Sequence, residues 1–214
     1  MLLWMEVLPV HDFKIESSIH DYEVRFIADA PSVLKNEIQD GDVIIIDNIV
    51  RRLYPDLLNG LDDNTVVIGL DAREDKKSYK GLIPIIQGLI NNGFRKNHRL
   101  IGIGGGIIQD ITAFTASIMY RGVKWIFFPT TLLAQGDSCI GSKTSINFGE
   151  YKNQIGGFYP PNKIFINLNF LDTLSSADLQ SGLGEMCHYF IVAGEKDFKE
   201  YKRHYEDALM DNKI

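Results

Sequence analysis

The chain is short of cysteine and carries no excess of positive charge. Its 214 residues include two cysteines, Cys139 and Cys187, and no Cys-x-x-Cys pair. This scarcity argues against a disulfide framework and fits a reducing cytosol. The net charge of −6 argues against a nucleic-acid-binding surface, so basic side chains that converge on one point are better explained by a small anion.

Long apolar runs are also absent. No run approaches the ~18 apolar residues that a membrane span needs, and the sequence has no internal repeat or low-complexity segment. The first ten residues are apolar but carry Glu6 and Pro9, and they lack a basic start and a small-residue cleavage site. We therefore expect no signal peptide, no membrane association and a cytoplasmic protein.

Apolar runs alternate with helix-like segments through the first three quarters of the chain. Strands are predicted at Trp4–Val10, Tyr22–Ala28, Asp42–Asp47, Thr65–Gly69, Leu100–Gly104 and Val123–Phe128. Helices are predicted at Ile49–Leu58, Ser78–Asn92 and Ile107–Tyr120, with Pro84 disturbing the second of them. This alternation predicts an α/β fold with a doubly wound, Rossmann-like parallel sheet.

The pattern changes near Leu174. Ser175 to Asp178 is a helix-start signal, and the remainder is predicted helical with a break near Gly194. We expect an α/β domain over residues 1–174 and the beginning of a helical domain over 175–214. The second segment is too short to complete a core, so we expect the chain to be cut short.

Three glycines, Gly104 to Gly106, separate a predicted strand from a predicted helix. Such a turn brings backbone N–H groups close to a phosphate or a dinucleotide. The G-x-G-x-x-G pattern, counted from Gly102, fails here because Ile107 stands where its last glycine is required. On this motif alone, a tight turn without a ligand is an equal alternative.

Polar residues also follow two other predicted strands. Asp47 can bond a ribose diol or cap the next helix, and capping is the simpler explanation. Thr130 and Thr131 can reach a cofactor or cap a helix near Leu132. Because ligands of such sheets bind beyond the carboxyl ends of the strands, all three are candidate binding residues.

Two further groups of residues have both a functional and a purely structural interpretation. The first group consists of Arg121, Asp137, Lys143, Lys152 and Asn153. Scattered Asp and Lys residues usually mark a solvated loop. In an acidic protein, however, two lysines and an arginine also suit a phosphorylated substrate. Glu185 and His188 share one helix face and can ligate a divalent metal, or they form a buried polar pair or a packing histidine. A catalytic zinc needs three protein ligands, and no further histidine pair follows.

Taken together, the motifs resemble the 3-dehydroquinate synthase family and the wider sugar phosphate cyclases. The matching segments are Glu74-x-x-Lys77-Ser78, GGGIIQD (104–110), Phe114–Ala116, Arg121-Gly122, PTTLLAQGDSCIGSKTSIN (129–147), YKNQIGGFYPP (151–161), Leu171–Leu174 and GLGE (182–185). They span most of residues 42–192 in the family's order.

The resemblance implies an NAD site in residues 1–174 and a metal and substrate domain that begins at 175. The implied cofactor residues are Asp47, Glu74, Lys77, Gly105, Gly106, Ile107, Asp110, Thr130, Thr131, Leu133, Asp137, Ser138, Lys152 and Thr173. The implied catalytic and substrate residues are Asp137, Lys143, Asn153, His188 and Arg121, the last offered to a neighbouring subunit of a homodimer. Glu185 is the implied ligand of a divalent metal, zinc or cobalt.

The implied activity is a lyase of the shikimate pathway of aromatic amino acid biosynthesis. It would convert 3-deoxy-arabino-heptulosonate 7-phosphate, a seven-carbon sugar phosphate, to 3-dehydroquinate and phosphate. NAD⁺ would oxidise a ring hydroxyl, phosphate would leave by elimination, and the hydride would return before an aldol ring closure.

Three residues depart from the family pattern. Gln109 and Ser142 stand where glycines are expected, and His188 stands where a lysine is expected. Ser142 and His188 keep open a cyclase of sedoheptulose 7-phosphate or a similar sugar. Two further alternatives are a metal-dependent polyol or glycerol-phosphate dehydrogenase of the same fold family, and a truncated, inactive nucleotide-binding homologue.

Overall fold

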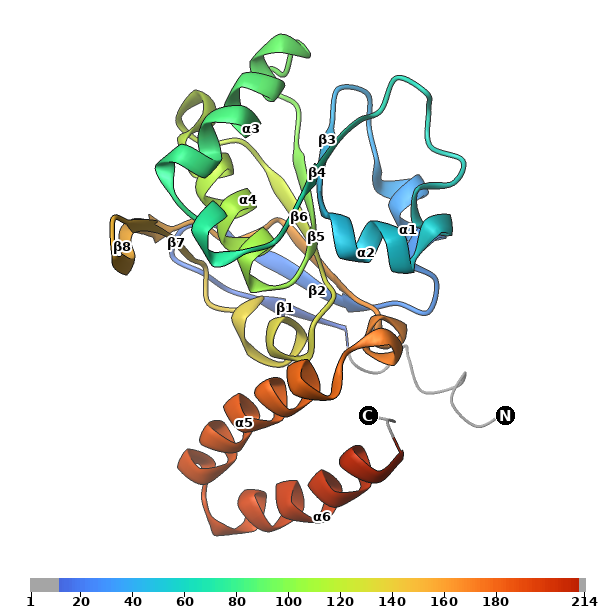
Figure 1. Ribbon diagram of the computed structural model, residues 1–214, viewed down its shortest axis with the longest axis vertical. Coiled ribbons are helices and arrows are strands. Elements are labelled where there is room, and N and C mark those ends of the chain that lie inside the picture. Colours follow the sequence, from blue (N-terminus) through green and yellow to red (C-terminus); the bar gives the residue numbers. More distant parts are fainter. Residues whose placement is uncertain (1–11, 212–214) are drawn as a thin grey trace.

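The computed structural model describes residues 12–211 and contains a seven-stranded sheet with helices on both faces (Figure 1). The strand order is β1-β2-β9-β6-β5-β3-β4, and every neighbouring pair is parallel except β1 with β2. The strands are β1 (Phe13–Ile15), β2 (Tyr22–Phe26), β3 (Val43–Asp47), β4 (Val66–Leu70), β5 (Leu100–Gly104), β6 (Trp125–Pro129) and β9 (Lys163–Ile166). The predicted doubly wound sheet is confirmed.

Two apolar layers enclose this sheet. Alternate residues of β3 point to opposite faces, so Ile45 packs with one layer and Ile44 with the other. The first layer contains α3 (Tyr79–Asn91) and α4 (Gly106–Ile118). The second contains α1 (Ala30–Glu37), α2 (Asn48–Leu53) and the short helices η2 (Pro55–Leu58) and η6 (Leu168–Thr173). Burial on both faces explains why these strands are continuous apolar runs.

The last two helices project from one end of the α/β layers (Figure 1). Helix α5 (Ser176–Ala193) begins with Ser175 as its N-cap, as predicted, and α6 (Glu195–Asp211) follows after Gly194. Leu179 and Leu183 of α5 pack against Leu132 in a small separate cluster. No helix in the described part of the chain is long and apolar enough to span a membrane.

Several elements escaped prediction from the sequence. They are β1, α1, β9 and a separate antiparallel hairpin formed by β7 (Lys143–Phe148) and β8 (Tyr151–Phe158). The predicted helix at 49–58 is wrong in one respect, because Pro55 divides it into α2 and η2. The predicted strand Trp4–Val10 lies outside the described residues.

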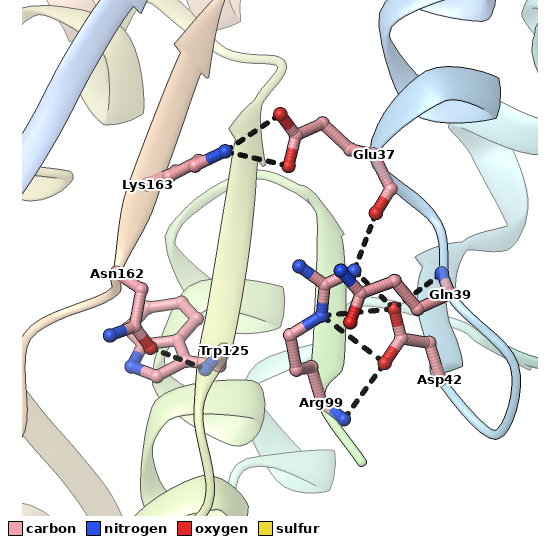
Figure 2. A network of polar contacts seen from close by, with 7 residues as sticks. All are labelled: Glu37, Gln39, Asp42, Arg99, Trp125, Asn162 and Lys163. Carbon is pink, nitrogen blue, oxygen red and sulfur yellow. Dashed lines mark hydrogen bonds and ion pairs between the residues drawn. The ribbon is translucent and has the colours of Figure 1, made fainter. Parts of the chain in front are cut away.

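A network of ion pairs and hydrogen bonds lies at the amino edge of the sheet, where the parallel strands begin (Figure 2). Arg99, just before β5, places Nη2 2.6 Å from Oδ2 of Asp42, just before β3, and it also donates to the carbonyl of Glu37. Lys163 at the start of β9 contacts the Glu37 carboxylate at 2.7 Å. This network therefore joins the starts of β3, β5 and β9 to the end of α1.

Candidate cofactor and substrate site

The carboxyl edge of the sheet has one topological switch point. Strands β3 and β5 are neighbours, but α2 after β3 covers one face and α4 after β5 covers the other. The chain therefore leaves the two strands in opposite directions, and doubly wound sheets bind ligands outside the carboxyl ends of the strands at such a point. Asp47 ends β3 and Gly104 ends β5 at this point.

The glycine turn between β5 and α4 is shaped for close backbone approach. Gly105 is the N-cap of α4 and provides no side-chain cap, so the N–H groups of the first turn are left for another acceptor. A Cβ on Gly105 would lie 2.9 Å from Cγ2 of Thr131, whereas one on Gly106 would meet nothing nearer than Oγ of Ser138 at 4.0 Å. Ile107 and Leu133 flank the turn and are half-buried.

Asp47 has the capping role that the sequence left as the simpler alternative. Its Oδ1 accepts a hydrogen bond from the N–H of Ile49 at 2.8 Å. Burial raises the pKa of Asp47 above its usual value, and the nearby charge of Asp71 adds to the rise. Since this bond uses only Oδ1, the second carboxylate oxygen is left as an acceptor at the switch point.

An ion pair lies behind the glycine turn. Nζ of Lys77 is 2.5 Å from Oδ2 of Asp110, and both side chains are largely buried. Burial raises the pKa of Asp110, while its bond to Lys77 and the backbone N–H of Ser145 oppose the rise. The pair links the segment after β4 to α4 and to the hairpin.

The hairpin is joined to the same segment by hydrogen bonds. Nδ2 of Asn147 on β7 donates to Oε1 of Glu74 at 2.7 Å, and its Oδ1 accepts from the N–H of Asn153 on β8 at 2.8 Å. Lys143 and Lys152 of this hairpin are exposed. The structure thus brings Glu74, Lys77, Asp110 and Asn153 into one network. Asn147 was missed from the sequence because its amide partner Glu74 lies 73 residues away.

A π-helical segment follows β6 and carries two more predicted residues. It spans Ala134–Ser138 (η5), and the hydroxyl of Thr131 accepts from its first N–H at 3.2 Å, which is the capping alternative. Thr130 is buried at the strand end. The hydroxyl of Tyr189 on α5 donates to Oδ1 of Asp137 at 2.6 Å, and this bond raises the pKa of Tyr189 to about 12. Short π-helical turns are frequent at functional sites.

Gln109 ties the start of α4 to this segment. The hydroxyl of Ser138 donates to Oε1 of Gln109 at 2.8 Å, and Nε2 of Gln109 donates back to the Ser138 carbonyl. The residue that departs from the family glycine therefore holds a predicted cofactor residue directly.

Arg121 lies far from this edge. It follows α4, which runs from the glycine turn to the amino edge of the sheet, and it precedes β6. Its side chain is exposed and its φ of +63° is left-handed, as is that of Tyr120 at +48°. The structure does not bring Arg121 together with the other candidate residues of the same chain.

Glu185 and His188 are both exposed on α5, so the buried-pair alternative is wrong. Helix α5 contacts the π-helical segment through Met186, which lies between these two residues and approaches Gly136. Within residues 12–211, no group of three His, Cys, Asp or Glu side chains is arranged to hold a metal ion. Thr173 is exposed at the end of η6, with its hydroxyl 2.9 Å from the hydroxyl of Tyr54.

The fold and its switch point define a doubly wound α/β protein in which the N-terminus of α4, at the carboxyl edge of the sheet, has no side-chain cap. Residues 67–181 match the family model of the 3-dehydroquinate synthase N-terminal region, and the chain belongs to that family.

A curated relative and one solved structure agree with this membership. The chain is 36% identical to the 3-dehydroquinate synthase of Legionella pneumophila (strain Corby) over 84% of its own length and 49% of the relative's. The chain therefore spans about half the length of the curated relatives it matches. The 2-epi-5-epi-valiolone synthase of Streptomyces hygroscopicus subsp. jinggangensis, solved with NAD⁺ and Zn²⁺, is 27% identical, with a TM-score of 0.78 over 92% of this chain and 56% of that one.

A 2-deoxy-scyllo-inosose synthase complexed with carbaglucose-6-phosphate, NAD⁺ and Co²⁺ has a TM-score of 0.69, over 81% of this chain and 49% of that one. At 21% identity, this likeness concerns the fold alone.

Proposed function

We propose that this chain is the NAD-binding half of a sugar phosphate cyclase, a lyase that releases phosphate from 3-deoxy-arabino-heptulosonate 7-phosphate and forms 3-dehydroquinate. The observation that carries the proposal is the uncapped glycine turn of α4, which faces Asp47 across the switch point. Membership of the 3-dehydroquinate synthase N-terminal family supports it.

The residues at the switch point fit NAD. The first-turn N–H groups of α4 suit a pyrophosphate, and the absence of a Cβ on Gly105 and Gly106 leaves room for it. The second oxygen of Asp47 suits a ribose diol. Glu74, Lys77, Asp110, Thr130, Thr131, Leu133, Ser138, Lys152 and Thr173 remain the proposed lining. Bound NAD⁺ would supply a reversible hydride acceptor, and the cofactor itself would be unchanged at the end of each turnover.

The metal fits less completely. Glu185 supplies one exposed carboxylate, whereas a catalytic zinc takes three protein ligands. We therefore assign Glu185 as one ligand of a divalent metal, zinc or cobalt, and derive no step from it. The zinc-bound valiolone synthase supports the choice of metal class.

The remaining polar groups suit a phosphorylated sugar. Lys143 presents an exposed ammonium group for phosphate, and Asn153 on the other strand of the hairpin is the second proposed substrate contact. Tyr189 holds Oδ1 of Asp137 and keeps its own proton, which leaves the second oxygen to accept a substrate hydroxyl. His188 is the proposed substrate contact on α5. The strained, outward-facing Arg121 suits the phosphate site of a second subunit, which makes the protein a homodimer.

Phosphate release tests this function. The 214-residue chain, and any longer product of its reading frame, is given each sugar phosphate with NAD⁺ and zinc or cobalt. Release without net NADH supports the cyclase. Release only from sedoheptulose 7-phosphate favours the alternative suggested by Ser142 and His188. Accumulating NADH contradicts both and indicates a polyol dehydrogenase, while NAD⁺ binding without release by the longest product of the reading frame indicates an inactive homologue.

A matched pair of lysine variants separates chemistry from general charge. We expect Lys143→Met to abolish phosphate release and to leave NAD⁺ affinity unchanged. Lys124→Met removes an equally exposed lysine just before β6, at the amino edge, and should change neither.

A further inference from the structure

Asn147 on β7 is a buried residue whose side-chain amide is bonded at both ends. The residue is only 8% exposed. Nδ2 donates to Oε1 of Glu74 at 2.7 Å and more weakly to the Glu74 carbonyl at 3.4 Å, and Oδ1 accepts from the N–H of Asn153 at 2.8 Å. The backbone N–H of Asn147 donates to the carbonyl of Lys77 at 2.7 Å.

Every one of these partners is a proposed binding residue. Glu74 and Lys77 lie in the segment after β4 and are assigned to the cofactor, and Asn153 lies on β8 and is assigned to the substrate. Among the described residues, Asn147 provides the only side chain bonded to both Glu74 and Asn153. Together with Glu74 and Lys152 it lines one cavity of about 560 Å³.

The contact with Asn153 fixes an uncommon backbone conformation. Asn153 has a φ of +55°, a left-handed value that is uncommon outside glycine and that asparagine adopts more readily than most residues. Its N–H is held by Asn147, and its Oδ1 accepts from the hydroxyl of Ser145 at 3.1 Å. Asn147 therefore sets the direction in which the hairpin presents Lys152 and Asn153.

An uncharged amide satisfies both neighbours at once. The Glu74 carboxylate needs a donor and the Asn153 N–H needs an acceptor, and an asparagine supplies one of each. An ionised aspartate would still accept from Asn153, but it would face Glu74 with a like charge. Leucine would remove both hydrogen bonds and leave the half-buried Glu74 carboxylate and the Asn153 N–H without this partner.

We propose that Asn147 is a positioning residue that couples the cofactor side of the site, through Glu74, to the substrate side, through Asn153. This inference rests on the proposed NAD⁺ and sugar phosphate site and adds to it a residue that touches neither ligand. Its action is exerted through the orientation of the Glu74 carboxylate and the left-handed turn at Asn153.

The test is calorimetry of NAD⁺ binding to the unaltered chain and to Asn147→Asp across a range of pH. We expect affinity to fall about tenfold at about pH 8, where the new carboxylate and Glu74 repel. The loss should shrink as the pH falls towards about 5.5, because the two carboxyls then share a proton and the hydrogen bond returns. A purely structural defect would not recover in this way. Asn97→Asp makes the same change at an exposed turn and should bind as the unaltered chain does.

A second readout does not depend on NAD⁺. In a double-mutant cycle of unfolding, the cost of Asn147→Asp should fall by at least half in the Glu74→Gln background, where the glutamine amide can donate to the new carboxylate. Affinity that is unchanged at every pH, or a cycle without coupling, would overturn the role of Asn147 and leave the proposed function standing. Failure of the unaltered chain to bind NAD⁺ would overturn the proposed function, and the cycle would still decide the coupling.

Discussion

The two edges of the central sheet both carry a buried ion pair, but the pairs lie in different surroundings. At the amino edge, the guanidinium of Arg99 bonds both oxygens of Asp42 and a carbonyl of α1 (Figure 2). At the carboxyl edge, Lys77 meets Asp110 beside a helix N-terminus without a side-chain cap, and burial raises the pKa of Asp110. The first pair is complete within the protein, whereas the second adjoins groups that still need partners.

This difference separates stability from function. A fully bonded pair joins strand to strand and has no capacity left for a ligand. The carboxyl edge keeps first-turn N–H groups without a side-chain cap and a second oxygen of Asp47, which remain available to a ligand. Substitutions at the two edges should therefore differ in kind.

The largest effect is expected at the amino edge. Arg99→Met leaves the Asp42 carboxylate buried without its partner, so the free energy of unfolding should fall by about 3 kcal/mol. Urea denaturation measures this loss, and calorimetry should find NAD⁺ affinity unchanged in the folded variant. As a control, Arg25→Met breaks an exposed pair with Glu23 and should cost less than about 1 kcal/mol. Equal costs for both variants would remove the proposed distinction.

The glycine turn should show the opposite behaviour. Gly105→Ala places a methyl 2.9 Å from Thr131 and next to the path of the ligand, so NAD⁺ affinity should fall at least about tenfold. Gly184→Ala is the matched control on α5, where a Cβ meets nothing within 4 Å. It should bind NAD⁺ normally and gain about 0.5–1 kcal/mol of stability from reduced backbone entropy. Normal NAD⁺ binding by Gly105→Ala would place the cofactor elsewhere.

The Asp110 carboxyl should titrate above its ordinary value of 3.8. The folded state then binds this proton more tightly than the unfolded state, so Asp110 makes folding less favourable as the pH rises between the two pKa values. Carbon NMR of the carboxyl, assigned with Asp110→Asn, measures the midpoint. Lys77→Met should raise the midpoint further, because the lysine charge lowers it. A midpoint at or below 3.8 would show that pairing with Lys77 outweighs burial.

The smallest effect is expected at Ser142, whose φ is +66°. Glycine relieves the left-handed strain but loses more backbone entropy, so Ser142→Gly should raise the free energy of unfolding by about 0.5 kcal/mol. Gly141→Ala, at a φ of +116°, should lower it. Thermal unfolding of both variants measures the difference, and a loss of stability in Ser142→Gly would mean that its side chain makes a favourable contact.

Much of the fold is predictable from the sequence because parallel strands that are buried on both faces consist of continuous apolar runs. The run Val43–Ile46 is buried on both faces, and it was correctly predicted as a strand. Helix α1 was missed because only Ala30 and Leu34 of its eight residues are buried, which leaves a weak helical period. The hairpin was missed because β8 is almost wholly exposed and takes its register from β7.

The candidate site is predictable only where it is local. The glycine turn and the N-cap position of Asp47 can be read from neighbouring residues, and the Glu185–His188 spacing follows from the helical repeat. The contacts of Asn147 and Tyr189 cannot be read in this way, since their partners Glu74 and Asp137 lie 73 and 52 residues away. Such contacts depend on how the elements pack.

The most direct test of the central claim is an NMR titration of the ¹⁵N-labelled chain with NAD⁺. The account predicts one bound NAD⁺ per chain, with amide shifts concentrated at Asp47, Gly105 and Gly106 and with the amides of Asp42 and Arg99 unchanged. No binding, or shifts centred on the amino-edge pair, would contradict it.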